Sequence, residues 1–160
     1  MGLDNIPHEY PCVNKKTAVM VTGQIDCKAT QEAGGCPWQN AEDRPQNGHV
    51  TGIFGTDCWY RGKYGNHLLE DVLGFYDETD GLSFYGSNAD GTHKSASECK
   101  TLAEVIESGM KEVTWDDNPE DKDYLEYGHV VNTKYKDDCE YAAWWLRWVA
   151  AEANGTDCWY

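Results

Sequence analysis

The stretch SASECKTLAEVIESGM, residues 95–110, carries the clearest helical pattern in the chain. Ser95 and Glu98 have the spacing of a capping box, in which each side chain bonds the backbone N–H of the other residue. Gly109 is positioned to end the helix. Apolar residues recur at helical spacing on one face, namely Cys99, Leu102, Ala103, Ile106 and Met110. The stretch therefore predicts an amphipathic helix with one buried face.

A second long helix is predicted over residues 137–153. Asp137 and Glu140 repeat the cap spacing, and Asn154-Gly155 is typical of a helix end. The apolar stripe comprises Cys139, Ala142, Leu146, Val149, Ala150 and Ala153, and adjacent positions carry Tyr141, Trp144, Trp145 and Trp148. A helix that is apolar nearly all round is either deeply buried or offers its second face to a partner. Burial is favoured, because aromatic side chains dominate domain cores.

Segments of β type flank these helices. Strands are predicted over residues 17–25 and 49–54. Asn66 can cap a short helix, and Asp80-Gly81 supplies the turn of a hairpin between two aromatic runs. Shorter strands are predicted in the stretches EVTW and YLEYGHVVN and after Gly155.

Residues 28–47 show little periodicity, so we predict a long surface loop pinned by Trp38. The remaining pattern, with two capped helices and a hairpin, predicts a single α+β domain over residues 1–160. We expect a mostly antiparallel sheet of about five strands, with the two long amphipathic helices on one face.

The hexapeptide GTDCWY occurs twice, at residues 55–60 and 155–160. The flanking sequences are unrelated, which argues against a duplicated domain. The first copy leads from a predicted strand into a basic loop, and the second supplies a predicted terminal strand. We expect the two segments to lie side by side in the sheet.

The formal net charge is −15, from 28 acidic and 13 basic side chains. This charge disfavours direct binding to nucleic acids and to anionic membranes. No apolar run approaches the ~20 residues of a membrane-spanning helix, and the first residues do not resemble a signal peptide. We therefore expect a cytoplasmic protein.

The same charge would attract a basic protein surface. No local catalytic signature accompanies any cysteine or histidine, so the sequence favours a non-enzymatic acidic binding protein. A solvated acidic run with no partner is the alternative interpretation. The residues expected to bind the partner are Asp116, Asp117, Glu120, Asp121 and Asp123, with Trp144 and Trp148 as aromatic anchors where they are exposed.

The stretch WYRGKYGN, residues 59–66, places basic residues in a glycine-containing loop before a predicted helix. Helix N-termini attract anions, and aromatic rings can stack on a base. A plain strand-to-helix turn explains the same stretch and is favoured. The alternative function is a small-molecule binder that sequesters a nucleotide-like anion through Trp59, Tyr60, Arg61, Lys63, Tyr64 and Asn66.

Seven cysteines are an odd number, so at least one thiol stays free. Buried, unreactive thiols are the simplest interpretation in a reducing compartment. The other interpretation is a zinc-supported structural protein in which the long loop folds back on the first strand. No Cys-x2-Cys or His-x3-His spacing supports it, and no other cofactor is predicted. The zinc ligands would be His8, Cys12, Cys27 and Cys36.

The order of segments from residue 52 to residue 160 resembles small bacteriophage proteins and proteins of their actinobacterial hosts. The resemblance lies in the loop CWYRGKYGN, the strand SFYGS, the capped helix SASECKTLAEVIES and the terminal aromatic helix. It implies a phage accessory or anti-defence role in the host cytoplasm, and it transfers no catalytic residue.

Overall fold

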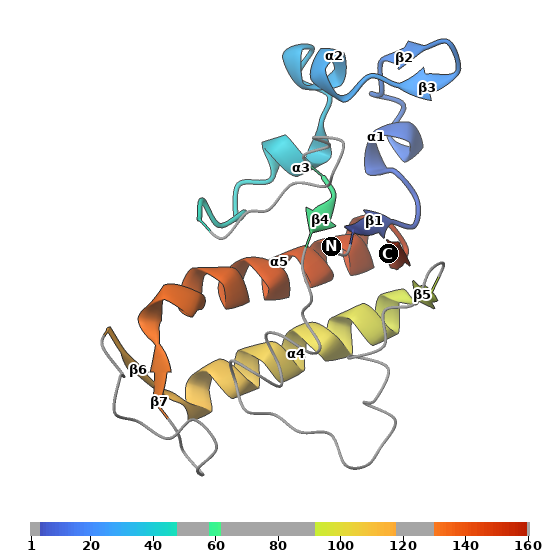
Figure 1. Cartoon of the computed structure of the whole chain (residues 1–160). Coiled ribbons are helices and arrows are strands. Elements are labelled where there is room, and N and C mark those ends of the chain that lie inside the picture. The colour runs from blue at the N-terminus through green and yellow to red at the C-terminus, as the bar shows by residue number, and fades with distance from the viewer. Residues whose placement is uncertain (1–3, 48–57, 62–91, 118–129, 160) are drawn as a thin grey trace.

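The computed structural model describes residues 4–47, 58–61, 92–117 and 130–159. At its centre two helices, α4 (Ala96–Glu112) and α5 (Lys136–Glu152), lie side by side and run in opposite directions (Figure 1). The predicted strand at 49–54, the short helix after Asn66 and the hairpin around Asp80-Gly81 lie outside the described residues.

The capping box predicted for α4 is confirmed. The Ser95 hydroxyl accepts from the Glu98 backbone N–H at 3.1 Å, and the Glu98 carboxylate accepts from the Ser95 N–H at 3.0 Å. The predicted end at Gly109 is wrong, because the helix continues to Glu112. Gly109 is buried on the core face, and packing there outweighs its cost of about 1 kcal/mol relative to Ala.

α5 is buried on both sides, as its sequence predicts. Tyr141 and Trp145 are fully buried, and Trp148 is 8% exposed. The predicted cap at Asp137 is wrong, because the helix follows a 3₁₀ turn (Thr133–Tyr135) directly and begins one residue earlier, with no side-chain cap. None of the described helices is long and apolar enough to cross a bilayer.

The fold is α+β with an antiparallel sheet, as predicted. The order of its strands is β4 (Tyr60–Arg61), β1 (Asp4–Pro7), β8 (Thr156–Trp159) and β5 (Thr92–Lys94). The described part of this sheet has four strands, whereas about five were expected. β6 (Thr114–Asp116) and β7 (Val130–Asn132) form a separate parallel pair at the other end of the helices (Figure 1).

The described residues of the two GTDCWY segments, 58–60 and 155–159, do not pair with each other, which corrects the expectation that the segments lie side by side. β1 lies between them, with Asn5 opposite Tyr60 on one side and opposite Cys158 on the other. The Asn5 side-chain amide also donates to the Tyr60 carbonyl at 2.9 Å. Both copies therefore border the same central strand.

Residues 10–47 form an N-terminal unit on the side of α5 that faces away from α4 (Figure 1). The strand predicted over 17–25 is wrong, because Thr22 and Gly23 both have positive φ and reverse the chain. The result is a small hairpin of β2 (Met20–Val21) and β3 (Gln24–Ile25). α1 (Pro11–Asn14) precedes this hairpin.

The long loop predicted over 28–47 is also wrong, because it contains helical turns. α2 (Cys27–Glu32) begins where the Asp26 carboxylate accepts from the Ala29 N–H at 2.9 Å. α3 (Pro37–Asn40) begins with a proline, which is preorganised for a first helical turn. Trp38 pins the segment as predicted, since it is 5% exposed and its indole N–H donates to the Tyr141 hydroxyl at 3.0 Å.

Candidate metal centre

Three neighbouring strands bring His8, His93 and Asp157 together. Asp157 on β8 is in register with Ile6 on β1 and with His93 on β5. His8 follows β1 directly, and its backbone N–H donates to the Gly155 carbonyl at 2.9 Å. Residues opposite each other, or two apart on one strand, share a face of the sheet. The three side chains therefore leave the sheet on the same side.

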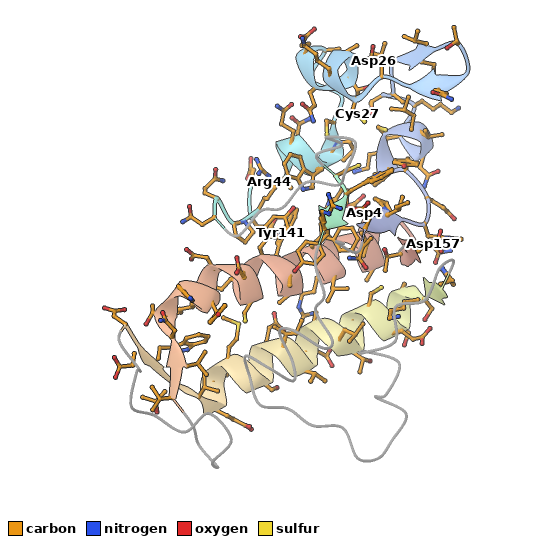
Figure 2. The ribbon with its side chains drawn as sticks, in the orientation of Figure 1. Asp4, Asp26, Cys27, Arg44, Tyr141 and Asp157 are labelled. Carbon is orange, nitrogen blue, oxygen red and sulfur yellow. The ribbon has the colours of Figure 1, made fainter. Side chains whose placement is uncertain are left out.

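The Asp157 carboxylate lies between the two imidazole rings. His8 Nδ1 is 3.0 Å from Oδ2, and His93 Nδ1 is 2.9 Å from Oδ1. The ring centroids are 4.2 Å apart. The three side chains are 39%, 43% and 32% exposed for His8, His93 and Asp157, so solvent reaches the group. Figure 2 shows Asp157 at the sheet, beside the end of α5.

Two imidazole nitrogens and one carboxylate oxygen are the ligands that a divalent transition metal prefers. One potential ligand atom from each of the three residues lies within 4.8 Å of the others. In a tetrahedral site, ligand distances of about 2.0–2.2 Å place neighbouring ligand atoms about 3.3–3.6 Å apart. The 2.9–3.2 Å separations between imidazole and carboxylate atoms are within a few tenths of this range.

A second cluster lies in the N-terminal unit, where Cys12, Cys27 and Cys36 line one small cavity. Sequence reasoning expected these three cysteines to converge, but it grouped them with His8. His8 is not part of the cavity wall, because its ring lies against Asp157 and His93. The fourth cysteine on the wall is Cys58, from the first GTDCWY copy. The six cysteines whose side chains the structure describes are all free thiols.

Burial raises the pKa of two thiols and one phenol on the wall of this cavity. It raises the pKa of the Cys12 thiol, and it raises that of Cys58 well above the usual value. Burial also raises the pKa of Tyr10 to about 12, although the Trp59 indole N–H, which donates to the Tyr10 hydroxyl at 3.0 Å, opposes it. These groups are therefore neutral near pH 7 when no cation is bound.

The residues expected to bind an anion do not form one exposed site among those described. Tyr60 is 4% exposed and stacks on Tyr141 with centroids 5.8 Å apart, which corrects its predicted ligand-stacking role. The Trp59 indole N–H is used by Tyr10, and Arg61 Nε lies 3.8 Å from an Asp4 carboxylate oxygen. Lys63, Tyr64 and Asn66 lie outside the described residues.

Of the residues expected to bind a basic partner, some lie in the described structure and some lie outside it. Asp116 is half-buried on β6 and Asp117 is exposed, whereas Glu120, Asp121 and Asp123 lie outside the described residues. Trp144 is partly exposed and stacks on the largely buried Trp148, with centroids 6.0 Å apart. Both rings line an open groove of about 590 Å³ between α5 and the N-terminal unit.

The chain shows no significant match to a protein family model, to a curated protein sequence or to a solved structure. The resemblance to phage proteins therefore stays a prediction.

Proposed function

We propose that the protein binds a divalent transition-metal ion, Zn²⁺ in the first instance, through His8, His93 and Asp157. The observation that supports this most strongly is that three potential metal-ligand atoms, from β5, from β8 and from the residue after β1, lie within 4.8 Å of one another. Imidazole and carboxylate ligands suit Zn²⁺, Fe²⁺ and Cu²⁺, whereas Mg²⁺ and Ca²⁺ prefer oxygen ligands alone.

The strands that carry the three ligands are held together firmly. The Thr156 hydroxyl donates to the Ile6 carbonyl at 2.7 Å, which couples β8 to β1 next to the site. β5 pairs with β8 from Thr92 to Lys94, on either side of His93. A preformed ligand set costs little ordering on binding, which favours affinity.

The exposure of the group has a chemical consequence. Three protein ligands leave at least one coordination position for water or for a ligand from another molecule. The charge of −15 also raises the local concentration of cations. The hydrogen-bonded His–Asp–His arrangement without a metal is the competing explanation, and it predicts no selective binding.

Titration of the protein with Zn²⁺ tests this proposal, with the imidazole ¹⁵N NMR signals and calorimetry as readouts. We expect the Nδ1 signals of His8 and His93 to shift together. Asp157→Asn and His93→Gln preserve size and hydrogen bonding, and each should weaken binding by about 100-fold or more.

Asp117→Asn is the matched control, because it removes one exposed carboxylate that follows β6, away from the sheet of β1, β8 and β5. It should leave Zn²⁺ affinity at this site within about twofold. The proposal is wrong if His8 and His93 signals do not respond to Zn²⁺, or if Asp157→Asn binds as tightly as the unmodified protein. The basic-partner and nucleotide-like anion hypotheses stay predictions.

A further inference from the structure

The N-terminal unit has a small apolar core, in which Cys12, Cys36 and Trp38 are the buried hydrophobic residues. Its helices and strands have between two and six residues each. Three large apolar side chains are exposed in the described structure, Val13 at 47%, Met20 at 52% and Val21 at 50%, and all belong to this unit. Units of this size usually need a disulfide or a metal to stay folded.

The four cysteines of the cavity come from four separate parts of this region. Cys12 lies in α1, Cys27 is the first residue of α2, and Cys36 precedes α3 as its N-cap. Cys58 lies just before β4, and its carbonyl accepts from the Trp145 indole N–H at 3.0 Å. A link between these thiols would join every helix of the unit to β4 and the core.

The cavity is the right size for a single ion. Its volume is about 20 Å³, and one water molecule needs about 10–15 Å³. A cluster with several iron and sulfur atoms needs far more space. The remaining wall is mostly apolar and includes Ile25, Trp38 and Trp148, which would exclude water from a bound ion.

The chemistry of the cavity wall is compatible with a bound cation. Four thiolates cannot share an apolar cavity unless a cation offsets their charge. The Gln39 N–H donates to Cys36 Sγ at 3.4 Å, and such an N–H bond to sulfur is compatible with a metal-bound thiolate.

We infer that Cys12, Cys27, Cys36 and Cys58 are the ligands of a structural Zn²⁺ ion that holds the N-terminal unit against β4. Tetrahedral thiolate coordination favours zinc among the common metals. Zn–S distances of about 2.3 Å place neighbouring sulfur atoms about 3.8 Å apart. Because the described thiols do not form a group of three within 4.8 Å, they must turn inward on binding. Zn²⁺ then replaces four thiol protons, which pass to solvent.

This site is separate from the one formed by His8, His93 and Asp157. Figure 2 shows Cys27 high in the N-terminal unit and Asp157 at the sheet, in a different part of the molecule. The donor atoms also differ, with sulfur in one site and nitrogen and oxygen in the other. The two proposals can therefore fail independently, and spectroscopy can distinguish them.

Replacement of zinc by Co²⁺ in the full chain tests the inference. We expect a thiolate-to-cobalt charge-transfer band. Native mass spectrometry should find one tightly bound ion per chain in the His93→Gln/Asp157→Asn double variant, which lacks two ligands of the other site. The band should persist in the His93→Gln/Asp157→Asn double variant. Cys27→Ser and Cys58→Ser should each weaken binding by about 100-fold or more and diminish the band.

Cys99→Ala and Cys139→Ala are the matched controls, because both residues are fully buried in the helix core and neither lines the cavity. Both variants should retain the full band. Absence of the band in the unmodified protein would overturn the inference even if the cysteine variants failed to fold. A disulfide between any two of the four cysteines in metal-free protein purified under reducing conditions would also overturn it.

Discussion

The helix pair and the N-terminal unit are stabilised in different ways. Between α4 and α5, Leu102, Ile106, Leu146 and Val149 are fully buried, so hydrophobic packing explains the stability of this region. The N-terminal unit leaves large apolar side chains in solvent and gathers cysteines around a cavity instead. We attribute the stability of the first region to an apolar core and that of the second to a bound metal ion.

The substitution Gly155→Ala should affect the site formed by His8, His93 and Asp157 without affecting the thiol cavity. Gly155 has a φ of 105°, and a Cβ there would collide with the Lys94 carbonyl oxygen. We expect a loss of about 1–3 kcal/mol in the free energy of unfolding, because a side chain strains this backbone conformation. Pairing between β5 and β8 should loosen, and Zn²⁺ affinity at His8, His93 and Asp157 should fall with it.

Calorimetry and the cobalt charge-transfer band would measure the two effects of Gly155→Ala. The band should be retained, since the cavity is built from other residues. Loss of the band with intact imidazole binding would reverse the assignment of the two regions.

Alkaline pH should destabilise the helix pair through the Cys139 thiol, which is buried in its core. Burial raises the pKa of Cys139 from 9.0 to about 12. The folded state therefore keeps a proton that the unfolded chain releases, and stability falls as pH rises from about 9 to about 12. Cys139→Ala should reduce this slope by up to about 1.4 kcal/mol per pH unit, measured by urea unfolding. An unchanged slope would show that Cys139 ionises normally in the folded protein.

The helices could be predicted from the sequence because their signals are local. The capping box at Ser95 and the positive φ of Gly155 lie within a few residues of the helix ends that they define. Gly109 misled the prediction of a helix end because tertiary packing determines its conformation. For residues 28–47, Asp26 and Pro37 were local signals for the starts of α2 and α3. They were overlooked because the segment has no apolar periodicity.

The two candidate sites depend on contacts that no local pattern contains. His93 and Asp157 are 64 residues apart in sequence and meet only because β5 pairs with β8. Three cysteines could be grouped from the sequence, whereas Cys58 joins them through the placement of β4 beside β1. The sequence prediction wrongly grouped His8 with the cysteines. The position of His8 beside β8 follows from the register of β1 with β8, which the sequence alone does not show.

The central claim is that a thiolate-bound ion stabilises the N-terminal unit independently of the helix core. Hydrogen exchange of the zinc-loaded protein, before and after a strong chelator, tests it most directly. We predict that amide protection in residues 10–47 falls by about 100-fold or more, while protection in α4 and α5 is largely retained. Leu102→Ala, which should cost about 2–5 kcal/mol, is predicted to weaken protection in the helices without releasing the metal. Equal protection of residues 10–47 with and without the chelator would contradict the claim.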